Sequence, residues 1–160
     1  PLTMTGMHHS LVTAETQILA NIQTLGGSPT FVVVACANCA QGAAALAVMM
    51  LMRKNAKMKS MASASGISAF LGITEPAIFG VNLKLRYPFY AALIGGGIGA
   101  AYATMMHVLS VSQGPCGLIG VICIRPDCML QFLVSTIITI ICTFIITILF
   151  GKTIGRKQQA

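Results

Sequence analysis

One acidic residue stands inside the apolar part of the sequence. Glu75 belongs to the stretch Gly72-Ile-Thr-Glu-Pro-Ala-Ile-Phe-Gly80, and the 160-residue chain contains only three Asp and Glu residues. Burying a carboxylate costs several kcal/mol unless it is paired or hydrogen-bonded, so Glu75 requires a partner. Two interpretations are open. The carboxylate hydrogen-bonds ligand hydroxyls or accepts a proton, or it pairs at an interface with Lys84 or Arg86.

The residues around Glu75 predict a break between two helical pieces. A residue that precedes proline is pushed towards extended backbone, and proline is tolerated at the first position of a helix. We therefore expect Pro76 to begin a short helix, with Glu75 just outside it. Gly72 and Gly80 let backbone or a ligand approach closely. These two glycines and Pro76 are the residues expected to shape the break.

The histidines are the other candidates for chemistry. His8 and His9 are adjacent, so their side chains point to different sides of a helix or strand; we expect one to face a site and the other to pack. His107 lies inside a predicted span and is expected to be a packing residue. Cys36 and Cys39 have CxxC spacing, but no second pair or histidine set completes a metal site. We therefore predict no metal and no cofactor.

The composition indicates an integral membrane protein. The chain is 56% hydrophobic and 8% charged, with a mean hydropathy of +0.83, whereas a soluble domain carries roughly 25% charged residues. The formal net charge is +7, but the Lys and Arg residues fall between apolar runs and no basic surface interleaved with aromatics is visible. Nucleic acid is therefore excluded as a partner, and the lipid bilayer is expected. No signal peptide is visible, and we interpret the chain as a piece of a longer polypeptide.

Three runs without Asp, Glu, Lys or Arg are long enough to cross a bilayer: residues 31–52, 88–111 and 129–150. A 22-residue helix is about 33 Å long, and the hydrocarbon core is about 30 Å thick. Residues 60–72 and 77–83 are each too short to cross, and basic residues flank both. They predict a re-entrant helical hairpin with Glu75 at its tip, since irregular backbone at membrane depth is tolerated only where it is buried or lines a cavity.

Small and polar residues indicate which faces of the spans meet protein. Gly95, Gly96, Gly97 and Gly99 give the second span a smooth surface for close helix packing. Asn38 and Gln41, which are one helical turn apart in the first span, should face protein rather than lipid.

The positions of the basic residues test this topology. If residues 53–59, residues 84–86 and the C-terminal tail share one side, nine of the ten Lys and Arg residues lie there and only Arg125 lies opposite. The positive-inside rule therefore favours the hairpin over a full crossing and predicts a cytoplasmic C-terminus. Two roles are open for Asn82, Lys84 and Arg86 at this cytoplasmic rim: neutralising a phosphate, or anchoring the topology.

The stretch Gly72-Ile-Thr-Glu-Pro-Ala-Ile-Phe-Gly-Val-Asn82 closely resembles the signature of the membrane-embedded IIC domains of the bacterial phosphoenolpyruvate-dependent sugar phosphotransferase system (PTS), in the glucose/sucrose superfamily. Residues 1–9 resemble the His-containing segment of that family, and residues 37–42 and 54–59 resemble the stretch between the two. The match covers most of residues 1–111. Within the superfamily, the sequence of these motifs most resembles that of sucrose-type permeases, then that of trehalose and β-glucoside permeases.

This resemblance implies an all-α integral membrane fold, with about three transmembrane helices plus a re-entrant hairpin, and a multi-pass location in the bacterial inner (plasma) membrane. Residues 1–160 would form the C-terminal part of a IIC transport domain, with no IIB or IIA domain in this sequence. A sugar, sucrose or a related disaccharide, would enter from outside and be phosphorylated on the cytoplasmic side. Glu75 and Thr74 would bind the sugar, and Glu75 would also help to activate a hydroxyl. One of His8 and His9, with His8 favoured, would bind or orient it.

The resemblance also implies partners. The phosphoryl donor would be a phosphocysteine on a IIB domain, itself supplied by IIA, so this chain alone lacks the donor site of a sugar phosphotransferase. The family implies a homodimer whose contacts lie largely in an N-terminal half that this sequence does not contain. Two competing hypotheses remain. The first is an ion- or proton-coupled secondary sugar transporter with Glu75 as the proton carrier. The second is a membrane subunit without a transport function, but the predicted burial of Glu75 argues against it.

Overall fold

The structure is a computed structural model that describes residues 8–21, 26–52 and 55–153. The regular elements in these ranges are helical, which confirms the predicted all-α fold. In chain order they are α1 (His8–Ala20), α3 (Thr30–Leu51), α4 (Ala56–Phe70), α5 (Glu75–Ala77), the π-helix η2 (Ile78–Asn82), α6 (Leu83–Leu85), α7 (Tyr87–Met105), the 3-10 helices η3 (Leu118–Cys123) and η4 (Pro126–Cys128), and α8 (Met129–Thr153).

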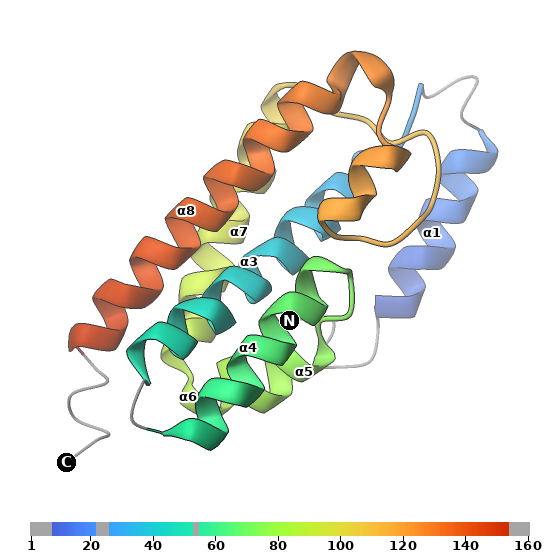
Figure 1. Ribbon diagram of the computed structural model, residues 1–160. Coiled ribbons are helices and arrows are strands. Elements are labelled where there is room, and N and C mark those ends of the chain that lie inside the picture. The colour runs from blue at the N-terminus through green and yellow to red at the C-terminus, as the bar shows by residue number, and fades with distance from the viewer. Residues whose placement is uncertain (1–7, 22–25, 53–54, 154–160) are drawn as a thin grey trace.

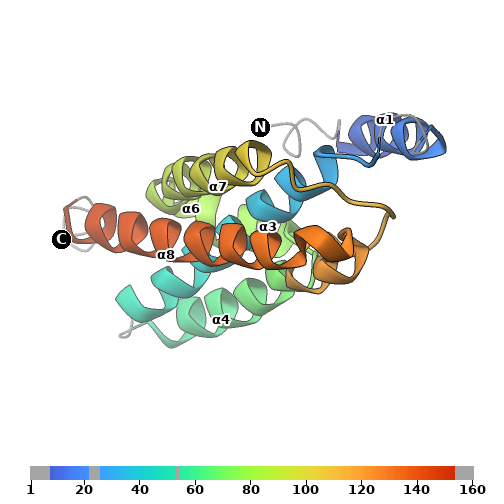
Figure 2. The ribbon, with the colours of Figure 1, turned by 90° about the horizontal axis from the view of Figure 1, so that it is seen from above.

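The helix α3 is the centre of the bundle. Helix α4 packs against one side of α3, and α7 and α8 pack against the other, while α1 stands at the far end with light contact to α3 (Figure 1, Figure 2). The buried face of α3 is built from small residues, among them Cys36, Ala40 and Ala44. Small residues let neighbouring backbones approach closely, so three helices can surround α3.

Two helices in the described ranges are long and apolar enough to cross a membrane: Thr30–Leu51 and Pro126–Thr153. They correspond to the first and third predicted spans. The second predicted span, residues 88–111, is wrong at its C-terminal end because α7 stops at Met105, after which His107 adopts a φ of +51°. The total number of spans stays a prediction.

The helices α7 and α8 are held close together by glycines that face hydroxyl side chains. A Cβ added at Gly99 would overlap Thr139 Oγ1 and would lie 3.0 Å from the Ser135 carbonyl oxygen. A Cβ added at Gly95 would overlap Thr143 Oγ1 in the same way. The close packing predicted for the glycine run is confirmed at these two positions, whereas a Cβ at Gly97 would meet open space.

Helix α4 and residues 75–85 form an antiparallel hairpin that starts and ends at the same end of α3 (Figure 1). Its turn lies beside the middle of α3. The Asn38 side chain donates a hydrogen bond to the Cys116 carbonyl, and the backbone of Cys116 lies against Gly72 in the turn. Asn38 is the ninth residue of α3, so it lies about 12 Å from the start of that helix. This is the chain path predicted for residues 60–83.

The connection between α7 and α8 folds back over the other end of α3. Phe31, Val108, Ile124 and Phe132 form a core cluster there, together with other buried residues. A Cβ at Gly117 would overlap the Phe70 carbonyl oxygen, so this connection packs directly against the hairpin turn. Within this connection, which joins the second and third predicted spans, the structure forms the two short helices η3 and η4.

Candidate functional site

Glu75 is the first residue of the second half of the hairpin, residues 75–85, which we call the return leg. Helix α5 begins at Glu75, with Thr74 before it and Pro76 in its first turn. The prediction that Glu75 lies just outside the helix is therefore wrong by one residue. The reason is that the first N–H groups of a helix have no acceptor within it, so proline is tolerated at the second position as well as at the first.

The carboxylate of Glu75 is exposed in this chain, contrary to the predicted burial. Among the described residues, neither Lys84 nor Arg86 forms an ion pair with it, since the one ion pair found there joins Arg125 to Asp127. The interpretation of Glu75 as half of an interfacial pair with these two residues is therefore wrong. The carboxylate remains available to a ligand or to another protein segment.

The return leg has one buried and one open face. Ala77, Ile78 and Val81 are buried against α3 and α4, whereas Glu75 and Phe79 are exposed. The π-helix η2 covers Ile78–Asn82, and single π-helical turns within helices are frequent at functional sites. The open face is therefore the side on which the predicted chemistry of Glu75 would take place.

Asn82 fixes the buried face of the return leg to α3. Its side chain is fully buried, and its Nδ2 donates hydrogen bonds to the Gln41 carbonyl at 3.0 Å and to Gln41 Oε1 at 2.7 Å. The prediction that Asn38 and Gln41 face protein is confirmed. The placement of Asn82 at the cytoplasmic rim is wrong, because an amide that forms a buried hydrogen-bonded pair cannot also reach a phosphate at the surface.

The turn residues differ in what they require. Gly72 has a φ of +104°, which favours glycine, and a Cβ there would lie 3.3 Å from the Cys116 nitrogen. A Cβ at Gly80 would make only ordinary contact with Met61, at 3.7 Å. Thr74 is buried and its carbonyl accepts the Ile78 N–H at 2.9 Å. Packing within the described residues therefore explains a glycine at position 72 but not at position 80.

Lys84 and Arg86 are both exposed where the hairpin ends and α7 begins. Arg86 has a φ of +63°, an uncommon conformation for a non-glycine residue. Its carbonyl accepts the N–H groups of Phe89 and Tyr90, which starts α7. Lys84 lies nine positions after Glu75 along the return leg, which corresponds to a rise of about 13 Å along the helix axis.

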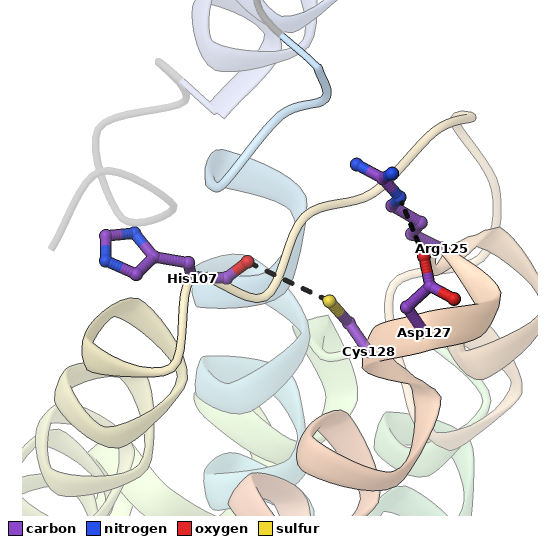
Figure 3. Close-up of polar contacts among 4 residues, drawn as sticks. All are labelled: His107, Arg125, Asp127 and Cys128. Atoms are coloured by element: carbon purple, nitrogen blue, oxygen red, sulfur yellow. Dashed lines mark hydrogen bonds and ion pairs between the residues drawn. The ribbon is translucent and has the colours of Figure 1, made fainter.

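The predicted histidine site is only partly described. His8 and His9 begin α1, but their side chains lie outside the described part of the structure, and their position relative to Glu75 stays a prediction. The interpretation of His107 as a packing residue inside a span is wrong, since it follows α7 and is exposed. Figure 3 shows its ring pointing away from Cys128, whose Sγ donates to the His107 carbonyl at 3.9 Å. The described residues contain no cluster that could hold a metal ion.

Glu15 is a buried carboxylate at the contact of α1 with α3. It is 6% exposed, and hydrogen bonds reach its carboxylate from the Ser28 hydroxyl and the Phe31 N–H at the start of α3. Burial raises the pKa of Glu15 above its ordinary value, while these two hydrogen bonds act in the opposite direction. Glu15 thus attaches α1 to α3. The scarcity of acidic residues in the sequence was the signal that could have identified it.

The comparisons with known proteins identify the family. Residues 1–96 match the family described as "Phosphotransferase system, EIIC". The chain belongs to this family. Domains of the EIIC family are embedded in a membrane, in agreement with the two helices that are apolar enough to cross one. The resemblance noted in the hairpin signature is confirmed.

Individual relatives extend the similarity over the whole EIIC chain. It is 46% identical to the "PTS system sucrose-specific EIIBC component" of Vibrio alginolyticus, over 100% of this chain and 34% of the relative. It is 45% identical to the sucrose-specific EIIBCA component of Pediococcus pentosaceus, over 99% of this chain and 24% of that relative. It is 39% identical to the trehalose-specific EIIBC component of Bacillus subtilis (strain 168), over 94% and 32%. The chain spans about a quarter to a third of these relatives. No solved structure matches it.

Proposed function

We propose that this chain is the C-terminal part of a PTS transport domain that binds sucrose or a related disaccharide and carries it to the site of its phosphorylation. The observation that carries the proposal is the exposed Glu75 carboxylate, placed at a hairpin turn beside the middle of α3. The similarity to sucrose-specific and trehalose-specific components supports the choice of substrate class.

Within this proposal Glu75 accepts hydrogen bonds from sugar hydroxyls and draws the proton from the hydroxyl that attacks the phosphoryl group. Sugar phosphorylation depends on positioning the acceptor hydroxyl and on stabilising the charge that is transferred. Thr74 binds the sugar beside Glu75, and His8 or His9 binds or orients it. Gly72 and Pro76 keep the turn in its shape.

The basic rim lies on the cytoplasmic side. Lys84 and Arg86 are exposed about 13 Å from Glu75 along the return leg. They face a IIB partner whose phosphocysteine receives its phosphoryl group from IIA. In this arrangement the hairpin enters and leaves the membrane on the cytoplasmic side, α7 is a further span, and the C-terminus is cytoplasmic. The assembled carrier is a homodimer in the bacterial inner membrane.

Energy coupling separates this function from a proton-coupled sugar transporter. Cells that carry the intact protein should accumulate labelled sucrose as sugar phosphate when the phosphoenolpyruvate relay is complete. Accumulation should stop when the relay is removed and should persist when the proton gradient is collapsed. Uptake that collapses with the proton gradient yet needs no relay protein would refute the proposal and favour the secondary transporter.

A further inference from the structure

The open face of the return leg carries an aromatic ring beside the carboxylate. Phe79 is 50% exposed and lies four residues after Glu75, whereas its neighbour Ile78 is 5% exposed. Residues four apart on a helix are neighbours on one face, with Cβ atoms about 5–6 Å apart. The side chains of Glu75 and Phe79 therefore face the same space.

With the hairpin within the membrane, as proposed above, that space is not hydrocarbon. A carboxylate facing lipid is costly, and ionisable residues within membrane segments face a protein interior or a water-filled cavity. An apolar surface of the kind that faces lipid is found on α8 instead. There, Ile137, Ile141 and Ile145 are each about half exposed, with no charged residue among them. Because Phe79 shares its face with Glu75, its exposed ring faces the same space as the carboxylate.

The ring of Phe79 is half exposed within the described residues. It makes no aromatic contact within the described part of the chain, where the aromatic pair found is Phe89 with Tyr90. Next to it, Gly80 would accept a Cβ with only ordinary contact to Met61. The packing of this chain therefore explains neither the exposed ring nor the glycine beside it.

A pyranose ring fits this combination of groups. The face of an aromatic ring carries partial negative charge, and the C–H groups of a sugar are polarised positively by the neighbouring oxygens. A pyranose whose hydroxyls are equatorial presents a flat C–H face to such a ring, and its hydroxyls reach outwards to a carboxylate at the edge. An axial hydroxyl would interrupt that face.

We propose that Phe79 is a specificity-determining residue, on which the gluco-configured ring of the substrate stacks while Glu75 accepts its hydroxyls. This inference rests on the proposed sugar-binding function. It adds to that function the aromatic ring that selects a pyranose whose free hydroxyls are all equatorial, and the side from which the sugar approaches the hairpin.

The test is equilibrium binding of sucrose, and of its epimer with an axial 4-hydroxyl on the glucosyl ring, to the intact carrier. Phe79→Leu keeps an apolar side chain but removes the ring, and we expect it to weaken sucrose binding about tenfold and to narrow the preference for sucrose over the epimer. Phe79→Tyr keeps the ring and should bind both sugars as the wild type does. Phe89→Leu, which removes a ring paired with Tyr90, is the matched control and should leave both affinities unchanged.

The outcomes separate this inference from the proposed function. If Phe79→Leu binds both sugars as the wild type does while Glu75→Gln loses binding, Phe79 packs against another part of the transport protein and the inference is wrong. If Glu75→Gln also binds sucrose as tightly as the wild type, the proposed sugar site itself is wrong. A loss of affinity in Phe79→Tyr equal to that in Phe79→Leu would also overturn stacking, because the ring is retained.

Discussion

The closeness of α7 and α8 gives a prediction of defined size. We consider Gly99→Ala, with Gly97→Ala as its matched control two residues earlier in the same helix. Both substitutions gain the same intrinsic helix propensity, about 1 kcal/mol in favour of alanine. They differ in surroundings, because a Cβ at Gly97 meets nothing within 4 Å, whereas one at Gly99 lies 2.9 Å from Thr139 Cβ and 3.0 Å from the Ser135 carbonyl oxygen.

The expected cost follows from these distances. Carbon atoms in good contact are about 3.5–4.0 Å apart, so α7 and α8 must separate by roughly 0.5–1 Å to relieve the contact with Thr139 Cβ alone, and the overlap with Thr139 Oγ1 requires a larger shift. The Thr139 hydroxyl cannot simply turn aside, since it donates to the Ser135 carbonyl at 2.7 Å. Overpacking of this kind costs about 1–3 kcal/mol. Gly99→Ala should therefore be less stable than Gly97→Ala by about that amount, with the propensity term cancelling.

The assay is denaturant or thermal unfolding of the intact carrier in detergent for the wild type and the two variants. Gly97→Ala should equal or exceed the wild type, and Gly99→Ala should fall below both. Adding Thr139→Ala to Gly99→Ala should recover part of the loss, because the overlapping hydroxyl is removed while the contact with the Ser135 carbonyl stays. Equal stability of Gly99→Ala and Gly97→Ala would refute the close packing of α7 on α8.

Three further predictions test other parts of the structure. Burial raises the pKa of Glu15, so its contribution to stability is complete below the ordinary pKa and is lost as pH rises through the folded-state pKa. The melting temperature of Glu15→Gln should therefore fall less than that of the wild type as pH rises from mildly acidic to neutral. Parallel curves of melting temperature against pH for the two proteins would contradict this. Asn82→Ala leaves Gln41 unpaired and should cost about 1–3 kcal/mol in unfolding, so wild-type stability would exclude the buried pair. In a cysteine-free background, single cysteines at positions 57 and 84 should label from one side of the membrane, and labelling from opposite sides would exclude the hairpin.

Much of the fold could be predicted because it depends on local composition. The uncharged runs that become α3 and α8 fixed those helices to within a few residues, and basic residues on both flanks of two short apolar pieces predicted the hairpin. The end of α7 could not be predicted, because residues 106–111 are apolar enough to continue a helix. They leave it to form the backbone pairing of Ser110 with Ser28, a long-range contact with no local signal.

The sequence predicted the residues of the candidate site, and their role stays a prediction, but it did not predict which of their side chains are exposed. Composition marked Glu75 as unusual, but whether a carboxylate is buried depends on which face of the return leg meets α3. The π-helix at Ile78–Asn82 sets that face, and it places Asn82 inside and Phe79 outside. No periodicity in an eleven-residue stretch reveals such a turn. The hydrogen-bonded role of Asn82 and the exposed ring of Phe79 therefore emerged only from the structure.

The most direct test of the central claim is sugar binding and phosphorylation by the intact carrier with Glu75→Gln. A hydrogen bond to a charged group contributes about 1.5–3 kcal/mol, so this variant should bind labelled sucrose about tenfold or more weakly and lose phosphoenolpyruvate-dependent phosphorylation while still inserting in the membrane. Asp127→Asn, at an exposed carboxylate paired with Arg125 at 3.3 Å, should behave as the wild type. Binding and phosphorylation of sucrose by Glu75→Gln at wild-type levels would contradict the account.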